Sequence, residues 1–552
     1  MKTTGAGSLV ECLKKEAITY IFGNPGTTEV AILDALVEEP RIEYVLALHE
    51  SVAVGMADGY ARAGGGVGFV NVHTALGTAN AIGNLYNAYI GRNPIVITIA
   101  NKDSRILGRD CYSDVPDLLG MTRQFTKWSW QVLWPQKIAE TIFRAIKVAT
   151  SRPTGPVFVS IPEDFLAQEM EIELPPSQRF GSPLNMRPDP QQMTKALELL
   201  LEAQRPLMIA GNEIAKSGAM EEAVTLAEQL AVPVMTEGRQ SLAFLNFPTT
   251  HALYRGVFDP ESHYVQSSDL LLGIGCKIVV ETVYSEATSR LSQIKTIHLH
   301  SDAGEIAKLY PVEVPILTEI KEGLIQFIAL IKHSISNESS ARLSHRFNAL
   351  KKEAEEIALS KSKQIQGAWN SVPISLERLI KEINTVADED AIIVDEAIRS
   401  SRALLNLYHF TQPATYFRSS GGYLGWGIPG ALGVKLASPE RQVIAFVGDG
   451  SFFFAPQALW TAARYNIPVV IVVCNNKGYK AVRDAAVRFQ GRAAETNLFI
   501  GSVIDDPVPK IAEIAEGFGV FGKRVTQPDE LRPMLEQTLH SGKPAVLDVM
   551  IA

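Results

Sequence analysis

The sequence predicts an α/β protein of three doubly wound domains with mostly parallel sheets, and two observations support this prediction. Short β-branched runs such as "GVGFVNVHT" and "NPIVITIAN" alternate with helical patterns along the chain. This βαβ rhythm is typical of parallel sheets. The chain has 552 residues, and domains of roughly 100 to 200 residues are usual, so several separate cores are expected.

Changes in composition divide the chain. A Pro- and charge-rich stretch at residues 170–190 reads as a linker, so the first domain is expected over 1–170 and the second over 190–335. The stretch at 337–367 is charged and helical without β-branched density, which predicts a connecting helix before a third domain at 370–552. The first and third domains end alike, each with a Gly-containing turn and a final apolar strand. This hints at two related folds.

Composition and charge exclude several classes of function. Hydrophobic residues make up 46% and charged residues 20%, as in an ordinary globular enzyme, and the net charge of −8 provides no basic field. Nucleic acid and anionic membranes are therefore poor candidate partners. Four scattered cysteines form no CxxC pair, the first residues lack the apolar core of a signal peptide, and no apolar run reaches the roughly 18 residues of a membrane span. We expect a cytoplasmic protein without a membrane partner.

Polar residues follow two apolar runs of the third domain. The run "RQVIAFVGDG" puts Asp449 at a strand end, and after a helical segment the run "IPVVIVVCNN" brings Asn475 and Asn476 to another. Ligands of parallel sheets bind at such carboxyl ends. Carboxylate, amide and carbonyl oxygens suit Mg²⁺ that also holds phosphate oxygens. The pattern therefore predicts a diphosphate anchored by a metal ion.

GDG, a helix, an apolar strand and NN, in this order and spacing, resemble the signature of thiamine diphosphate-dependent enzymes. The resemblance implies a pyrimidine-binding first domain, a central domain and a diphosphate-binding third domain. It implies that Mg²⁺ is bound by Asp449, the side chain of Asn476 and the carbonyl of Gly478. It further implies cofactor contacts at Gly448, Gly450, Ser451 and Tyr479.

The resemblance also requires a glutamate at a strand end of the first domain. "YVLALHE" supplies Glu50, followed by the "MADGYARA" segment that is characteristic of the family. By the resemblance, Glu50 is catalytic and contacts the cofactor: it shares a proton with the aminopyrimidine N1′ and so favours the imino form of the 4′-amino group. A glutamate that merely begins a helix would look the same in isolation.

Two further segments resemble cofactor contacts of the family. In "RSSGGYLGWGIPG", the carbonyl of Gly422 would receive the 4′-amino group, and Leu424 would be the apolar wedge that bends the cofactor. In "VDEAIRSSRALL", Ser400 or Ser401 would lie at a helix start near the diphosphate. Serine at such a position is also an ordinary helix cap.

Within the family, the chain is most similar to benzoylformate decarboxylase, judged from "FGNPGTTEVAILDAL" and "NVHTALGTANA". Thr27 stands where that pattern has a serine that meets the substrate carboxylate, and His73 matches an active-site histidine for proton transfer or substrate positioning. The pattern departs in the second domain, where Glu281 and Thr282 occupy the neighbourhood of another expected histidine. The acid–base groups there stay open, with four histidines as alternatives: His251, His263, His298 and His300.

Two activities remain open from the sequence. One is decarboxylation of a 2-oxo acid; the other is an acetolactate synthase-like carboligase or C–C lyase reaction, which the loop "GRDCYSDVPDLLGMTRQFTKWS" favours.

FAD in the central domain is possible but not favoured. A nucleotide-dependent dehydrogenase is disfavoured because no GxGxxG follows a strand with an acidic residue downstream. A binding protein without activity would be expected to lose Glu50, Asp449 or Asn476. The resemblance implies a homodimer or homotetramer with the cofactor at the subunit interface and a small 2-oxo acid as substrate.

Overall fold

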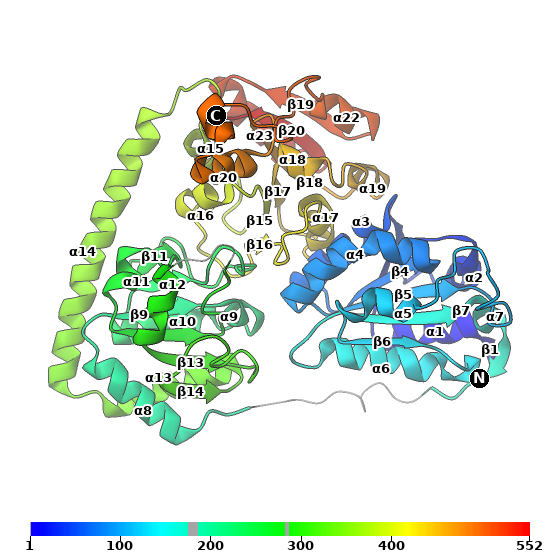
Figure 1. Cartoon of the computed structure of the whole chain (residues 1–552), viewed down its shortest axis with the longest axis horizontal. Helices are drawn as coiled ribbons and strands as arrows, with labels where there is room; N and C mark the ends of the chain where they lie inside the picture. The colour runs from blue at the N-terminus through cyan, green and yellow to red at the C-terminus, as the bar shows by residue number, and fades with distance from the viewer. Residues whose placement is uncertain (1, 175–185, 282–285) are drawn as a thin grey trace.

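The computed structural model describes residues 2–174, 186–281 and 286–552, and it forms three lobes, each built on a parallel six-stranded sheet (Figure 1). The α/β architecture with three parallel sheets is thereby confirmed. Residues 175–185 of the predicted linker at 170–190 lie outside the described residues. The exact domain boundaries stay a prediction.

The sheet of the first lobe has the strand order β3-β2-β4-β5-β7-β6, all parallel. A short antiparallel pair, β1 with β8, lies outside it. The elements are β1 (Lys2–Thr4), α1 (Gly5–Lys15), β2 (Tyr20–Asn24), η1 (Thr27–Glu29), α2 (Val30–Val37), β3 (Glu43–Leu46), α3 (Glu50–Arg62), β4 (Gly68–His73), α4 (Thr74–Gly91), β5 (Ile95–Asn101), α5 (Leu118–Arg123), β6 (Trp128–Gln131), α6 (Ile138–Thr150), β7 (Val157–Pro162), α7 (Glu163–Ala167) and β8 (Glu169–Glu171).

The third lobe repeats this topology. Its order β16-β15-β17-β18-β20-β19 matches the first sheet strand for strand, so the hint of two related folds is confirmed. The elements are α15 (Leu376–Val386), β15 (Ile392–Glu396), α16 (Ser401–Leu407), β16 (Tyr416–Arg418), α17 (Gly427–Ala437), β17 (Val443–Gly448), α18 (Asp449–Phe452), α19 (Ala458–Arg464), β18 (Val469–Asn475), α20 (Lys480–Phe489), α21 (Arg492–Thr496), α22 (Ile511–Gly517), β19 (Phe521–Val525), α23 (Pro528–Leu539) and β20 (Ala545–Met550).

The central lobe has the order β11-β10-β9-β12-β13-β14, which is the strand order of nucleotide-binding doubly wound folds. Its elements are α8 (Pro190–Glu202), β9 (Pro206–Ala210), α9 (Asn212–Lys216), α10 (Met220–Leu230), β10 (Val234–Thr236), β11 (Tyr254–Val257), α11 (His263–Ser267), β12 (Leu270–Ile274), α12 (Glu286–Ser289), β13 (Lys295–His300), β14 (Val314–Leu317) and α13 (Ile320–Ser334).

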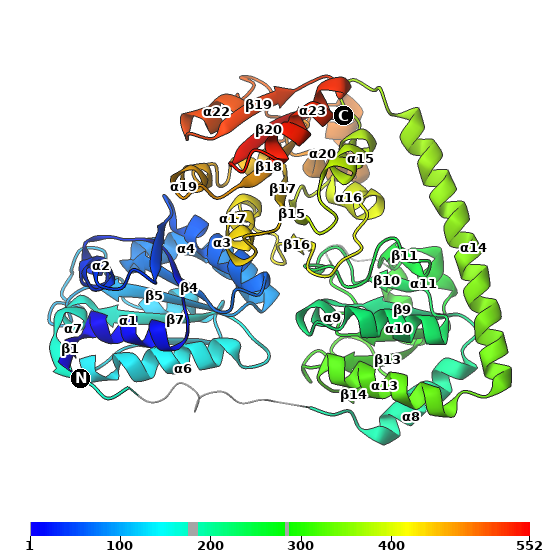
Figure 2. The same ribbon diagram turned by 180° about the vertical axis from the view of Figure 1, so that it is seen from behind.

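The predicted connecting helix is present as α14 (Asn337–Gly367). Seen from behind, it runs along the outside of the molecule from the central to the third lobe (Figure 2). Among the described residues, no helix combines the length and apolarity needed to cross a bilayer.

The strands that carry the polar motifs are apolar and buried over nearly their whole length. Every residue of β18 is buried, and β17 is buried as far as Val447. Strands buried on both faces are typical of parallel sheets with helices on both sides. Their first polar residues therefore emerge at the carboxyl edge of the sheet, where Asp449 and Asn476 lie.

The first and third lobes pack directly through α3 and α17. A Cβ atom on Gly59 would lie 2.1 Å from the carbonyl oxygen of Gly430, so the two helices approach at backbone distance. Asp58 of α3 accepts hydrogen bonds from Arg62 Nε (2.8 Å) and from the indole of Trp426 (2.6 Å). This contact sets the position of the segment before α17 relative to the first lobe.

Candidate active site

The turn after β17 forms the centre of the candidate site. Asp449 is 3% exposed, and its Oδ2 accepts a hydrogen bond from the backbone N–H of Gly478 at 2.7 Å. Burial raises the pKa of Asp449, while backbone N–H donors act in the opposite direction. The Tyr479 ring lies against Gly450, within 2.5 Å of a Cβ placed there. The structure thus brings together the predicted residues of two neighbouring strand ends.

The two asparagines after β18 have different surroundings. Asn475 donates to Asp548 Oδ1 at 2.7 Å and accepts from the N–H of Lys477, so its side chain is used inside the sheet. Asn476 Oδ1 instead accepts from Arg483 Nη2 at 3.0 Å, at the sheet edge. This difference supports Asn476 as the candidate metal ligand.

The helix start after β15 lies beside this turn. Ser401 Oγ donates to the buried Asp395 Oδ1 at 2.9 Å, so this hydroxyl already has a structural partner. Ser400 is the residue before α16 and makes no side-chain cap hydrogen bond. Ser451 Oγ donates to the carbonyl of Glu396 at 3.0 Å, which joins the turns after β15 and β17.

The segment with Gly422 and Leu424 is held against the first lobe of the same chain. Asn87 of α4 donates to the carbonyl of Tyr423 (3.0 Å) and accepts from its N–H (3.2 Å). Gly422 has φ +81°, a backbone conformation that favours glycine. Its carbonyl and Leu424 therefore lie in an irregular segment whose position depends on neighbouring side chains.

Glu50 begins α3, as expected, and is 7% exposed. Asn80 of α4 donates to Glu50 Oε2 at 3.0 Å, and the carboxylate lies close to Gly77. Sequence reasoning missed Asn80, although its place in the "TANA" segment that follows His73 could have suggested it. Asn80 fixes the orientation of the Glu50 carboxylate.

A second polar group surrounds His73 at the end of β4. Its Nδ1 lies 3.0 Å from both Thr28 Oγ1 and Glu29 Oε2. Glu29 is fully buried, and burial raises its pKa despite the backbone donors Gly26 and Ala100 and the neighbouring His73. Thr27 is the exposed first residue of η1. The structure thus brings the segment that carries Thr27 next to His73, and it adds Glu29, which sequence reasoning had missed.

Within one chain, no hydrogen bond between described residues joins the Glu50 group to the Asp449 group. The bonded partner of Glu50 comes from α4, and that of Asp449 from the turn after β18. Near the latter, α20 and α21 have no buried residue, and Phe489 and Ile500 are 85% and 87% exposed.

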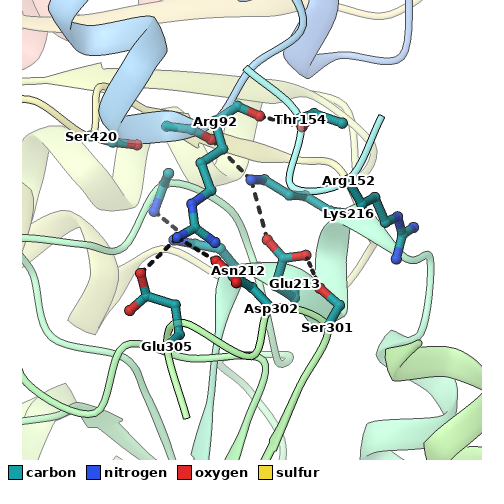
Figure 3. A network of polar contacts seen from close by, with 12 residues as sticks. Arg92, Arg152, Thr154, Asn212, Glu213, Lys216, Ser301, Asp302, Glu305 and Ser420 are labelled. Carbon is teal, nitrogen blue, oxygen red and sulfur yellow. Dashed lines mark hydrogen bonds and ion pairs between the residues drawn. The ribbon is translucent and has the colours of Figure 1, made fainter. Parts of the chain in front are cut away.

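A cavity of about 800 Å³ lies between the central lobe and the other two, and it reaches Gly422. Figure 3 shows the charged network around it. Arg92 Nη2 contacts Asp302 (2.8 Å) and Glu305 (2.6 Å), and Lys216 Nζ contacts Glu213 (3.3 Å). Burial tends to raise the pKa of Glu213, but Lys216, His300 and Ser301 together lower it to about 2.

The central-lobe candidates differ in position. His298 and His300 line the cavity, and burial lowers both pKa values, that of His300 to about 4. Glu281 accepts a hydrogen bond from Thr288 Oγ1 at 2.6 Å. Thr282 lies outside the described residues. His251 Nε2 lies 3.2 Å from Glu228 Oε1, a contact within the central lobe.

The donors at the third sheet edge fit a magnesium-bound diphosphate. A buried carboxylate, an amide oxygen and a turn carbonyl are the hard oxygen ligands that Mg²⁺ takes. The first lobe offers a carboxylate, Glu50, without a cationic partner among the described residues.

Comparison with known proteins identifies the family of the chain. Three consecutive family models match: the N-terminal TPP binding domain of thiamine pyrophosphate enzymes at residues 3–121, their central domain at 193–327, and their C-terminal TPP binding domain at 399–549. The chain belongs to the thiamine pyrophosphate enzyme family.

The relatives include both activities expected from the sequence. Benzoylformate decarboxylase from Pseudomonas aeruginosa is 30% identical over 100% of this chain and 99% of its own length. A probable acetolactate synthase large subunit from Methanococcus aeolicus is 29% identical over 99% of this chain and 92% of its own. The solved structure of a thiamine diphosphate-dependent 4-hydroxybenzoylformate decarboxylase from Rhodococcus jostii superposes with a TM-score of 0.83 at 27% identity, covering 100% and 99% of the two chains.

Proposed function

We propose that this chain catalyses the thiamine diphosphate- and Mg²⁺-dependent decarboxylation of a 2-oxo acid, breaking the C–C bond beside the carbonyl. One observation carries the proposal: the buried Asp449 carboxylate at the end of β17, bonded to the Gly478 turn of the neighbouring strand. The full-length relative named benzoylformate decarboxylase supports the reaction type.

The residues of the site have separate roles. When bound, thiamine diphosphate supplies the carbon nucleophile that adds to the substrate carbonyl. Asp449, Asn476 and Gly478 would hold Mg²⁺. Glu50 would hold a proton at the pyrimidine ring, and Asn80 keeps its carboxylate in place through the 3.0 Å hydrogen bond. The remaining cofactor contacts are assigned to Gly448, Gly450, Ser451, Tyr479, Ser400, Gly422 and Leu424. Ser401 is assigned a position near the diphosphate without a direct contact.

The substrate side is assigned to Thr27 and His73. Because His73 Nδ1 is bonded to Glu29 and Thr28, Nε2 is the ring nitrogen left for the substrate. Thr27 is exposed and keeps a hydroxyl for the substrate carboxylate. His73 then moves a proton or positions the substrate.

The second candidate is a carboligase that joins the decarboxylated fragment to a carbonyl acceptor. The acetolactate synthase relatives favour it, because they align over nearly the whole chain. FAD is not part of either proposal.

Product analysis tests and separates the two activities. Purified protein with thiamine diphosphate and Mg²⁺ is given aromatic and aliphatic 2-oxo acids, and CO₂ and organic products are measured. Aldehyde in equal amount to CO₂ indicates the decarboxylase, whereas a hydroxyketone or 2-hydroxy-2-alkyl-3-oxo acid indicates the carboligase. Asp449→Ala should abolish cofactor binding in calorimetry; unchanged binding with Mg²⁺ present would show that the metal site is elsewhere.

A further inference from the structure

A buried carboxylate beside the candidate site has no role in the proposal so far. Glu396 is the last residue of β15 and is 3% exposed. Its Oε1 accepts from the N–H of Trp426 at 2.9 Å, and its Oε2 accepts from the N–H groups of Gly425 and Gly427, both at 3.1 Å. Both carboxylate oxygens are therefore occupied by backbone donors.

These donors directly follow Gly422 and Leu424. The segment 422–427 has no regular ladder, and both Gly422 and Gly425 have positive φ, +81° and +89°. Its conformation therefore depends on hydrogen bonds from neighbouring elements. Asn87 holds it on the side of the first lobe, and Glu396 holds it on the side of the third sheet.

Glu396 also contacts the diphosphate side of the site. Its carbonyl accepts the hydroxyl of Ser451 at 3.0 Å, and it pairs with Val447 across the sheet. The packing here is tight, because a Cβ atom on Gly427 would lie 2.8 Å from both Glu396 Cβ and Val447 Cγ1. One residue thus connects the two segments assigned to the two halves of the cofactor.

We propose that Glu396 is a positioning residue for the pyrimidine half of the cofactor: it holds residues 425–427 and thereby places the Gly422 carbonyl and Leu424 relative to the turn at Asp449. This inference rests on the proposed function. Glu396 touches neither substrate nor metal in this scheme, and it acts through the segment it holds.

The position requires a carboxylate rather than a carboxamide. Three N–H donors divide between two oxygens, whereas glutamine has one oxygen and would turn an NH₂ group toward at least one N–H. The negative charge also suits the start of α17, where the first N–H groups lack helical partners. Burial raises the pKa of Glu396 to about 7 against the effect of its three donors, so binding is best measured at pH 8.

The test compares two ligands by calorimetry at pH 8: thiamine diphosphate with Mg²⁺, and magnesium pyrophosphate alone. Glu396→Gln should weaken the binding of thiamine diphosphate at least about tenfold, because a hydrogen bond to a charged group typically contributes this much free energy. Magnesium pyrophosphate should bind nearly as in the wild type, because the carbonyl contact with Ser451 is unchanged.

A matched control is Glu382→Gln. Glu382 is another buried carboxylate of the third lobe, paired with Arg378 (2.8 Å) and Arg532 (2.7 Å), and it lies away from the segment 422–427. Its replacement should lower the thermal midpoint and leave both affinities unchanged. A folded Glu396→Gln that binds thiamine diphosphate like the wild type, or that loses both ligands equally, overturns the inference.

A second variant covers the case in which Glu396→Gln does not fold. Gly427→Ala keeps the carboxylate but pushes its donor away, so it should show the same selective loss; normal affinity for thiamine diphosphate overturns the inference. If the wild type binds magnesium pyrophosphate but not thiamine diphosphate, the proposed function and this inference both fail. If the wild type binds thiamine diphosphate and the variants do too, only this inference fails.

Discussion

Glu50 contributes a buried carboxylate, which accepts a hydrogen bond from the side chain of Asn80 at 3.0 Å. Glu50→Gln keeps the size and the ability to bond Asn80 but removes the acid. The cofactor should still bind, while turnover and exchange of the cofactor C2 hydrogen should slow by about 10²- to 10⁴-fold, the usual worth of an acid–base group. The exchange is followed by NMR on acid-quenched protein, and wild-type rates would mean that Glu50 merely begins a helix.

Glu237 is a buried carboxyl group whose protonation affects the stability of the fold. It lines the central cavity, is 1% exposed, and accepts the N–H of Lys277 at 3.0 Å. Burial raises its pKa to about 8 from 4.5. The folded state therefore binds a proton that the unfolded state has released, so stability is lost as pH rises from about 4.5 to about 8.

The corresponding test measures the free energy of unfolding by denaturant between pH 5.5 and 8.5. Glu237→Gln should be less sensitive to pH than the wild type, with a difference on the order of a few kcal/mol over this window. Glu202→Gln, at an exposed position of α8, should follow the wild-type curve. Parallel curves for wild type and Glu237→Gln would show that Glu237 does not carry this dependence.

At the scale of elements, α3 carries a buried ion pair, and its Asp58 also accepts the indole N–H of Trp426 directly before α17. Asp58 and Arg62 have fully buried side chains 2.8 Å apart, and Arg62 also donates to the carbonyl of Arg418 at 2.6 Å. Asp58→Asn leaves the guanidinium without its counter-ion, so it should destabilise by about 3 to 5 kcal/mol. Denaturant unfolding measures this, with Glu140→Gln as the control, because Glu140 belongs to an exposed pair with Lys137 whose loss should cost at most about 1 kcal/mol. Equal small effects would refute the interface role.

The elements themselves could be predicted where the pattern is local. The buried apolar runs of β17 and β18 placed Asp449 and Asn476 at one edge, because parallel strands end on the same side. The hydrogen bond of Trp426 to Asp58 joins residues 368 positions apart. The periodicity of apolar residues along the sequence cannot predict such a pairing. Glu396 could have been suspected, since a carboxylate at the end of "AIIVDE" must find donors, but the donors themselves could not be named. The same holds for Glu29, whose partner His73 lies 44 residues away.

At the scale of the whole molecule, the repeated topology of the first and third sheets makes it reasonable that two chains combine them. Within one chain the Glu50 and Asp449 groups have separate partners, and the face around Phe489 and Ile500 is exposed and apolar. Such a face on a folded enzyme suits burial by another protein surface. We therefore expect a two-fold homodimer, or a tetramer of such dimers, in which Glu50 of one chain meets Asp449 of the other.

Co-expression of two inactive variants tests this arrangement directly. If each site combines Glu50 of one chain with Asp449 of its partner, a mixed dimer of Glu50→Gln and Asp449→Ala contains one doubly altered site and one intact site. Random pairing makes half of the dimers mixed, so the preparation should regain about a quarter of the wild-type activity, although each variant alone is inactive. If each site were built within one chain, every site in the mixed dimer would carry one defect and no activity would return. Purifying mixed dimers through two different tags sharpens the measurement to about half of the wild-type activity per dimer; inactive mixed dimers, or a fully active monomer in sedimentation, would exclude the shared site.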